Sequence, residues 1–142
     1  MKKVFLDTNV LMDMLLVREP HNLYSMQVFE LGRKKEEVLL AVSCLSMANA
    51  QYLLARYGAS VTAIRSLLTD VSQACELVAL NEKAVVGALA AQRFNDIENA
   101  MQHQCAKACG ADVIITRDVH DFRHSDILTM SANEFLLSIG KI

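Results

Sequence analysis

The sequence predicts an α/β protein: a four- or five-stranded parallel sheet with helices on both faces, in a three-layer α/β/α sandwich. Two observations lead to this prediction. Short apolar runs alternate along the 142 residues with longer segments whose apolar residues recur at helical spacing. The chain also has one domain's length, a single proline and no linker or repeat. We therefore expect one domain over residues 1–142.

The strands are predicted from short runs of β-branched and other apolar residues. Val4 to Leu6 is such a run near the N-terminus, and 38–42, with the sequence VLLAV, is a longer one. Runs of this kind predict strands at 4–6, 38–42, 77–80, 113–116 and 127–130.

The helices are predicted from apolar periodicity and from residues that cap helix ends. Asn81 and Asp96 stand where N-caps are needed, and Gly110 stands where a helix should end. The resulting helices are expected at 9–16, 21–35, 45–56, 61–72, 81–92, 96–109 and 132–139.

Composition excludes several classes of protein. A hydrophobic share of 53% excludes a disordered chain, and a net charge of −2 argues against a basic DNA-coating protein. Neither excludes a nucleic-acid enzyme with an acidic site. No apolar run approaches the ~18 residues of a membrane span, and Asp7 interrupts the first run too early for a signal peptide. A cytoplasmic protein without a membrane segment is expected.

The four cysteines do not form a recognised zinc motif. Cys105 and Cys109 share a helical face near His103, but no fourth ligand stands at a known spacing. Reduced, mostly buried thiols are the favoured interpretation.

Polar residues are predicted to meet at one edge of the sheet. In open parallel sheets, ligands bind beyond the carboxyl ends of the strands. The first strand ends at Asp7, the second at Ser43 and the fourth at Asp118, and the helix beginning at Asp96 should start on the same side. The expected cluster contains Asp7, Thr8, Asn9, Ser43, Asp96, Glu98, Asn99, Thr116, Asp118 and Asp121.

Such a cluster of acids favours a metal site. Neighbouring carboxylates repel one another unless a cation neutralises them, and hard oxygen ligands select Mg²⁺ or Mn²⁺. A metal of this kind suits phosphodiester hydrolysis. Each acid also has a structural interpretation, because Asp7, Asp96 and Asp118 all stand where a turn or helix cap would be favourable.

The motifs resemble those of the PIN domain family. VFLDTNVLMDML is similar to the family's first motif, and FNDIENAMQHQCAKACGADVIITRDVHDF resembles its later ones. SCLSMANAQYLLAR and SDILTMSANEFL fit the intervening segment and the last strand with its helix, so the resemblance covers nearly the whole chain. It implies a Rossmann-like fold, a Mg²⁺- or Mn²⁺-dependent ribonuclease, and RNA as substrate. Small members include VapC-type toxins that a partner antitoxin silences, and a homodimer is common.

The resemblance also implies roles for individual residues. Asp7 matches the first acid, Asp96 the first acid of the later helix, and Asp118 the last acid, and these three are the expected catalytic residues. The expected metal ligands are the same three with Asn99. Arg117 and Arg123 flank the site and are the expected RNA contacts. Supporting roles are expected for Asn9, Ser43, Asn49, Glu98, Thr116 and Asp121.

Two positions depart from the family pattern. Asn49 stands where members usually have Glu, and Asn99 stands where they usually have Asp. An amide oxygen can coordinate a metal, but it brings no charge and cannot act as a base. The alternative is therefore a catalytically impaired PIN-fold module that binds RNA or protein.

Overall fold

The computed structural model describes all residues from Met1 to Ile142. The strands are β1 (Lys2–Leu6), β2 (Val38–Ser43), β3 (Cys75–Val78), β4 (Val113–Ile115) and β5 (Leu128–Met130). The helices are α1 (Thr8–Leu15), α2 (Asn22–Lys34), α3 (Cys44–Arg56), α4 (Val61–Ala74), α5 (Glu82–Ala90), α6 (Ile97–Ala108), the 3₁₀ helix η1 (Val119–Phe122) and α7 (Ala132–Ser138).

All five strands are parallel and form one sheet in the order β3-β2-β1-β4-β5. β1 therefore lies at the centre, where Phe5 pairs with Ala41 of β2 and with Ile114 of β4. This register brings the residues that follow β1, β2 and β4 to the same edge. The predicted fold class, with its five-stranded parallel sheet, is confirmed.

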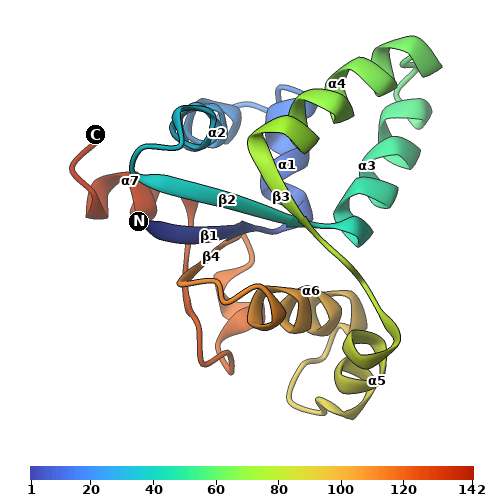
Figure 1. The fold of residues 1–142 in the computed structure, drawn as a ribbon, viewed down its shortest axis with the longest axis vertical. Helices are drawn as coiled ribbons and strands as arrows, with labels where there is room; N and C mark the ends of the chain where they lie inside the picture. The colour runs from blue at the N-terminus through green and yellow to red at the C-terminus, as the bar shows by residue number, and fades with distance from the viewer.

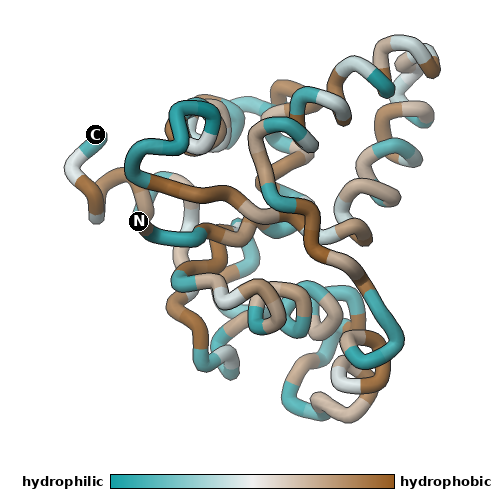
Figure 2. The backbone as a smooth tube through the Cα atoms, in the orientation of Figure 1, coloured by the Kyte–Doolittle hydropathy of each residue, from teal (hydrophilic) through white to brown (hydrophobic).

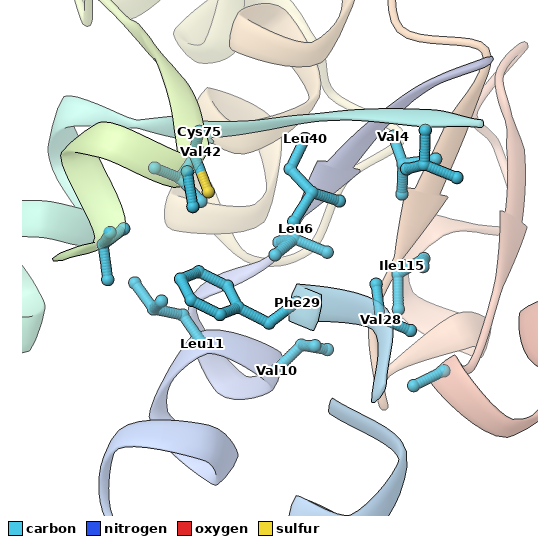
Figure 3. Packing of buried hydrophobic residues seen from close by; sticks show 14 of the residues in the cluster. Val4, Leu6, Val10, Leu11, Val28, Phe29, Leu40, Val42, Cys75 and Ile115 are labelled. Carbon is cyan, nitrogen blue, oxygen red and sulfur yellow. The ribbon is translucent and has the colours of Figure 1, made fainter. Parts of the chain in front are cut away.

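Helices cover both faces of the sheet. In Figure 1, α1 to α4 lie on one face and α5 and α6 on the other. Successive side chains along a strand point to opposite faces of the sheet, and so alternate residues enter different cores. Val4 and Leu6 belong to the larger core with Phe29 of α2, which Figure 3 shows packed against the strands. Phe5 belongs to the smaller core under α6. Figure 2 shows β2 as a mainly hydrophobic segment between these layers.

Gly32 allows α2 to approach the sheet closely. A Cβ atom built at this position would overlap the side chain of Leu40 on β2. Only a residue without a side chain fits there unless the helix moves away, and so Gly32 sets the spacing of the layer that covers β2.

The third strand differs most from its prediction. It was expected at 77–80, but β3 spans Cys75–Val78 and follows α4 without a loop. Pairing of Leu40 with Cys75 starts the strand two residues earlier, and Leu80 packs against the smaller core from outside the strand. The helix expected at 81–92 also ends early, at Ala90.

None of the helices has the length and apolar run needed to cross a membrane.

His103 on α6 gives the fold a predictable pH dependence. It is 6% exposed and packs on Phe94, with the ring centroids 5.0 Å apart. Burial lowers the pKa of its imidazole, although Asp126, 3.3 Å from Nε2, opposes this effect. The unfolded chain therefore takes up this proton more readily. The stability that depends on neutral His103 is present above the unfolded pKa of about 6.5 and is lost as pH falls below it.

The wild-type protein should lose unfolding free energy as the pH falls from about 7.5 to about 5. We expect this loss to be smaller in His103→Gln, because Gln takes up no proton in this range. Urea denaturation at both values measures it, and His124→Gln, at an exposed histidine, is the matched control. The same pH dependence in wild type and His103→Gln would contradict the prediction.

Candidate active site at the carboxyl edge of the sheet

Asp7 is the buried centre of this edge. It follows β1, is 4% exposed and caps α1, where its Oδ1 accepts a hydrogen bond from the backbone N of Thr8 at 2.9 Å. The hydroxyl of Thr116, directly after β4, donates to Oδ2 at 2.8 Å. Burial raises the pKa of Asp7 and the charge of Asp118 adds to the rise, whereas these hydrogen bonds oppose it. The carboxylate is thus held in place despite a cost in lost solvation.

A buried glutamine on α6 donates a hydrogen bond to Asp7. Gln102 on α6 has no exposed surface, and its Nε2 donates to Asp7 Oδ1 at 3.3 Å, Thr8 Oγ1 at 2.9 Å and Ser46 Oγ at 2.7 Å. Its Oε1 accepts from the hydroxyl of Ser43 at 2.6 Å. Ser43 therefore supports the site indirectly, through Gln102 and as the N-cap of α3.

Asn9 fixes the segment that follows β4. Its Oδ1 accepts from the backbone N of Arg117 at 3.2 Å, and its Nδ2 donates to Asp118 Oδ2 at 3.0 Å. The backbone N of Asp118 donates to Thr116 Oγ1 at 3.0 Å. Asp118 is exposed but is oriented on both its backbone and its side chain. Asn9, Thr116 and Asp118 are thus brought together at Asp7, as the sequence predicts.

Glu98 and Asn49 approach the same edge from α6 and α3. The Nδ2 of Asn49 donates to Glu98 Oε1 at 2.9 Å. Partial burial raises the pKa of Glu98, and the charges of Asp7 and Asp96 raise it further, while the hydrogen bond from Asn49 opposes the rise. Glu98 is therefore the acid of α6 whose carboxylate is hydrogen-bonded to Asn49 of α3.

Asp96 is held elsewhere. Its Oδ1 accepts from the backbone N of Asn99 at 3.0 Å and caps α6. Asp96, Asp121 and Arg123 line a separate depression of about 100 Å³. The structure contains no group of three or more His, Cys, Asp or Glu side chains that could hold a metal ion. The helix cap occupies Oδ1 of Asp96, and a joint metal site of Asp7, Asp96 and Asp118 stays a prediction.

The other predicted residues take part in the cap of α6, line the separate depression or lie elsewhere. Asn99 takes part in the cap through its backbone N, and it stands one helical turn before Gln102, on the face of α6 that reaches Asp7. Asp121 and Arg123 belong to the separate depression, not to the edge at Asp7. His103, Cys105 and Cys109 form no metal-binding group either.

Arg117 is anchored by an acid that the sequence analysis did not single out. Asp13 on α1 is fully buried and forms ion pairs with Arg117 Nε at 2.8 Å and with Arg18 Nε at 2.9 Å. The two guanidinium groups of Arg18 and Arg117 thus share the one carboxylate of Asp13, beside Asp118. These three side chains together carry a net charge of +1. Asn9 and Asp13 stand at i and i+4 on α1, so one helical face holds both Asp118 and Arg117.

Gln102 and Asp13 are the functional-site residues that sequence reasoning missed. A signal existed for both, because each is a polar residue close in sequence to apolar residues. Gln102 stands between Ala100 and Ala106, and Asp13 interrupts the run LMDML. A polar side chain in such a position needs a buried partner.

Chemically, the edge offers only oxygen donors and one nearby arginine. Asp7 and Asp118 supply the carboxylates, with Glu98 on a third side and amide oxygens from the asparagines. This donor set suits a hard divalent cation and a phosphate oxygen rather than zinc or a redox metal.

Comparisons with known proteins agree with this geometry. A family model described as PIN domain matches residues 3–120. Ribonuclease VapC1 of Aquifex aeolicus (strain VF5) is 26% identical over 141 residues, which is 94% of this chain and 93% of that protein.

Two solved structures have the same fold. VapBC2 from Rickettsia felis, bound to a promoter DNA fragment, has a TM-score of 0.67 at 16% identity and covers 91% of this chain and 97% of its own. VapC20 of Mycobacterium tuberculosis, described as a sarcin–ricin loop cleaving toxin, has a TM-score of 0.68 at 12% identity and covers 88% and 96%. Since the family model spans the chain from β1 to beyond Asp118, this chain belongs to the PIN domain family.

Proposed function

We propose that this PIN domain protein is a divalent-metal-dependent ribonuclease of the VapC type. The observation that supports this most is the position of Asp7, a buried carboxylate fixed by two side chains and one backbone N, near the oriented carboxylate of Asp118, since Thr116 bonds to both residues. The relative named Ribonuclease VapC1 supports the choice of RNA.

The residues present fit Mg²⁺ or Mn²⁺. Mg²⁺ in phosphoryl-transfer sites is held by one or two protein carboxylates, and water and substrate phosphate complete its shell. A third carboxylate is therefore unnecessary. The charge of Asp118 already raises the pKa of Asp7, and a cation between them would relieve this repulsion. We propose Asp7 and Asp118 as the ligands, with Glu98 and Asn99 as the nearest further oxygen donors and Asp96 as a helix cap.

The chain's own residues would divide the work of hydrolysis as follows. A bound cation would supply Lewis-acid polarisation of the phosphoryl group and acidify nearby water. Asp7 is kept rigid by Thr116 and Gln102, so its position does not change as charge develops on the substrate. Arg117, held by Asp13, provides a guanidinium for a phosphate oxygen.

The similarity to a toxin solved with its antitoxin also supports a partner protein. The Rickettsia felis relative was solved as a VapBC2 assembly, and we propose that an antitoxin of the VapB class regulates this chain. If a small gene lies directly upstream, co-expression of its product with this chain, followed by size-exclusion chromatography, tests the pairing. A homodimer stays a prediction.

The proposed reaction is tested by cleavage of labelled single-stranded RNA with Mn²⁺, with Mg²⁺ and with a chelator. Cleavage that depends on the added metal supports the proposal. Saturable RNA binding without cleavage under any of these conditions would instead favour the impaired module.

Replacing Asn49 tests whether its missing charge weakens the metal site. We expect Asn49→Glu to bind Mn²⁺ about tenfold more tightly, because a further carboxylate adds charge attraction to the site. Without metal the variant should be less stable than wild type, because the new carboxylate faces Glu98 in place of the hydrogen bond at 2.9 Å.

Calorimetric titration with Mn²⁺ measures the affinity, and Asn49→Gln is the matched control, since it has the same length without the charge. Equal affinities of N49E and N49Q would show that position 49 lies outside the metal's reach.

A further inference from the structure

A cavity adjoins the proposed active site. It has a volume of about 490 Å³ and lies between α2 and the start of α7, with α1 as its floor. Asp118 and Arg117 border it on the side of the active site, and His21, Tyr24, Ser131 and Asn133 border it elsewhere. A molecule whose phosphate reached Asp118 would therefore have room for its next part in this cavity.

The lining matches a nucleoside better than an apolar ligand. Only three of its eleven residues are hydrophobic. Single-stranded RNA is commonly recognised by bases that stack on aromatic side chains and form hydrogen bonds through their edges. Tyr24 offers an aromatic ring, and His21 and Asn133, both exposed, offer polar groups for base edges. The volume lies within the range of pockets that enclose small organic ligands, about 300–1,000 Å³.

Charge also favours a nucleotide at this position. Asp13 lies at the floor of the cavity and is already neutralised by Arg18 and Arg117, which stand 2.9 Å and 2.8 Å from its oxygens. Arg18 and Arg117 share this one carboxylate, and the carboxylate of Asp118 borders the same cavity. A phosphate held by Arg117 would lie beside the carboxylate of Asp118, whose repulsion the proposed cation would offset, and the base would turn away toward Tyr24.

We infer that this cavity, called here the α2–α7 cavity, binds the nucleoside of the RNA that flanks the cleaved phosphodiester. The inference rests on the proposed ribonuclease function and adds to it a source of sequence preference. Arg117 contacts the phosphate, Tyr24 stacks with the base, and His21 and Asn133 discriminate between bases.

Binding can be tested without catalysis, by titrating ¹⁵N-labelled protein with each of the four 5′-mononucleotides and recording amide shifts. We expect saturable shifts at Tyr24, Ser25 and Ala132, with one nucleotide preferred. His21→Ala/Asn133→Ala should weaken that binding at least tenfold. Gln27→Ala is the matched control, because Gln27 is exposed on the same helix but outside the cavity. Shifts confined to other surfaces, or equal binding by the double variant, would overturn the inference.

Cleavage provides the second measurement. With a pool of randomised RNA, wild type should prefer one nucleotide beside the cut, and the double variant should lose that preference while still cleaving. An unchanged preference in the double variant would overturn the inference and leave the ribonuclease intact. Absence of cleavage by wild type together with saturable nucleotide binding in the cavity would reject the proposed function but support a nucleotide site.

Discussion

Asp7→Asn is expected to reduce RNA cleavage at least 100-fold and to abolish Mn²⁺ binding. The variant loses the negative charge of the proposed ligand that Thr8, Gln102 and Thr116 hold in place, and the remaining amide attracts a divalent cation far less. The measurements are initial rates on single-stranded RNA with saturating Mn²⁺ and a calorimetric titration.

Asp96→Asn is the informative control for this prediction. Asp96 caps α6, and Asn is an equally good N-cap. The variant should therefore keep cleavage within a few-fold of wild type. If it lost as much activity as Asp7→Asn, Asp96 would have to move into the metal site during catalysis, and the division of roles proposed here would be wrong.

Folding should not explain the loss in Asp7→Asn. Burial raises the pKa of Asp7 above its ordinary value of 3.8, so the folded state holds this proton more tightly than the unfolded chain does. The group therefore contributes stability below the unfolded pKa, and that contribution is lost as pH rises through the folded pKa. An uncharged Asn avoids this loss but keeps one acceptor oxygen in place of two, and the variant's melting temperature at neutral pH should therefore stay close to that of wild type.

The parallel sheet was predictable because its signals are local. Each strand is a short apolar run, and β1 and β2 begin and end within two residues of their predicted bounds. Since carboxyl ends of parallel strands meet, Asp7, Thr116 and Asp118 could also be placed together. The start of β3 could not, because it is set by pairing with Leu40 rather than by the residues of the strand itself.

The membership of the site depends on side-chain partners that the sequence leaves open. Asp96 can be a ligand, a cap or both, and the structure shows its Oδ1 accepting from the backbone N of Asn99 as a cap. The hydrogen bonds of Gln102 link residues up to 95 positions apart. A local pattern cannot predict such a partner, although a buried polar residue signals that one must exist.

Asp13→Ala is expected to lower the unfolding free energy by about 2–3 kcal/mol. Removing one member of a buried ion pair leaves its partners unpaired, at a cost of about 3–5 kcal/mol. The lower figure applies here because the side chains of Arg18 and Arg117 are each 37% exposed and can turn toward water. Urea denaturation measures the change, which should appear in the midpoint and not in the slope.

Arg18→Gln is the control that distinguishes the loss of the buried Asp13 carboxylate from the loss of a single ion pair. It removes the contacts of Arg18 with Asp13 and with the backbone O of Asn9 but leaves Arg117 paired at 2.8 Å, and so it should lower the unfolding free energy by only about 1 kcal/mol. The two variants should also differ in function. Asp13→Ala releases Arg117 from its position beside Asp118, which should raise the KM for RNA more than it lowers kcat, whereas Arg18→Gln should leave KM nearly unchanged. Equal effects of the two variants on KM would mean that Arg117 does not depend on Asp13 for its position, and the guanidinium would then lose its proposed place at the substrate phosphate.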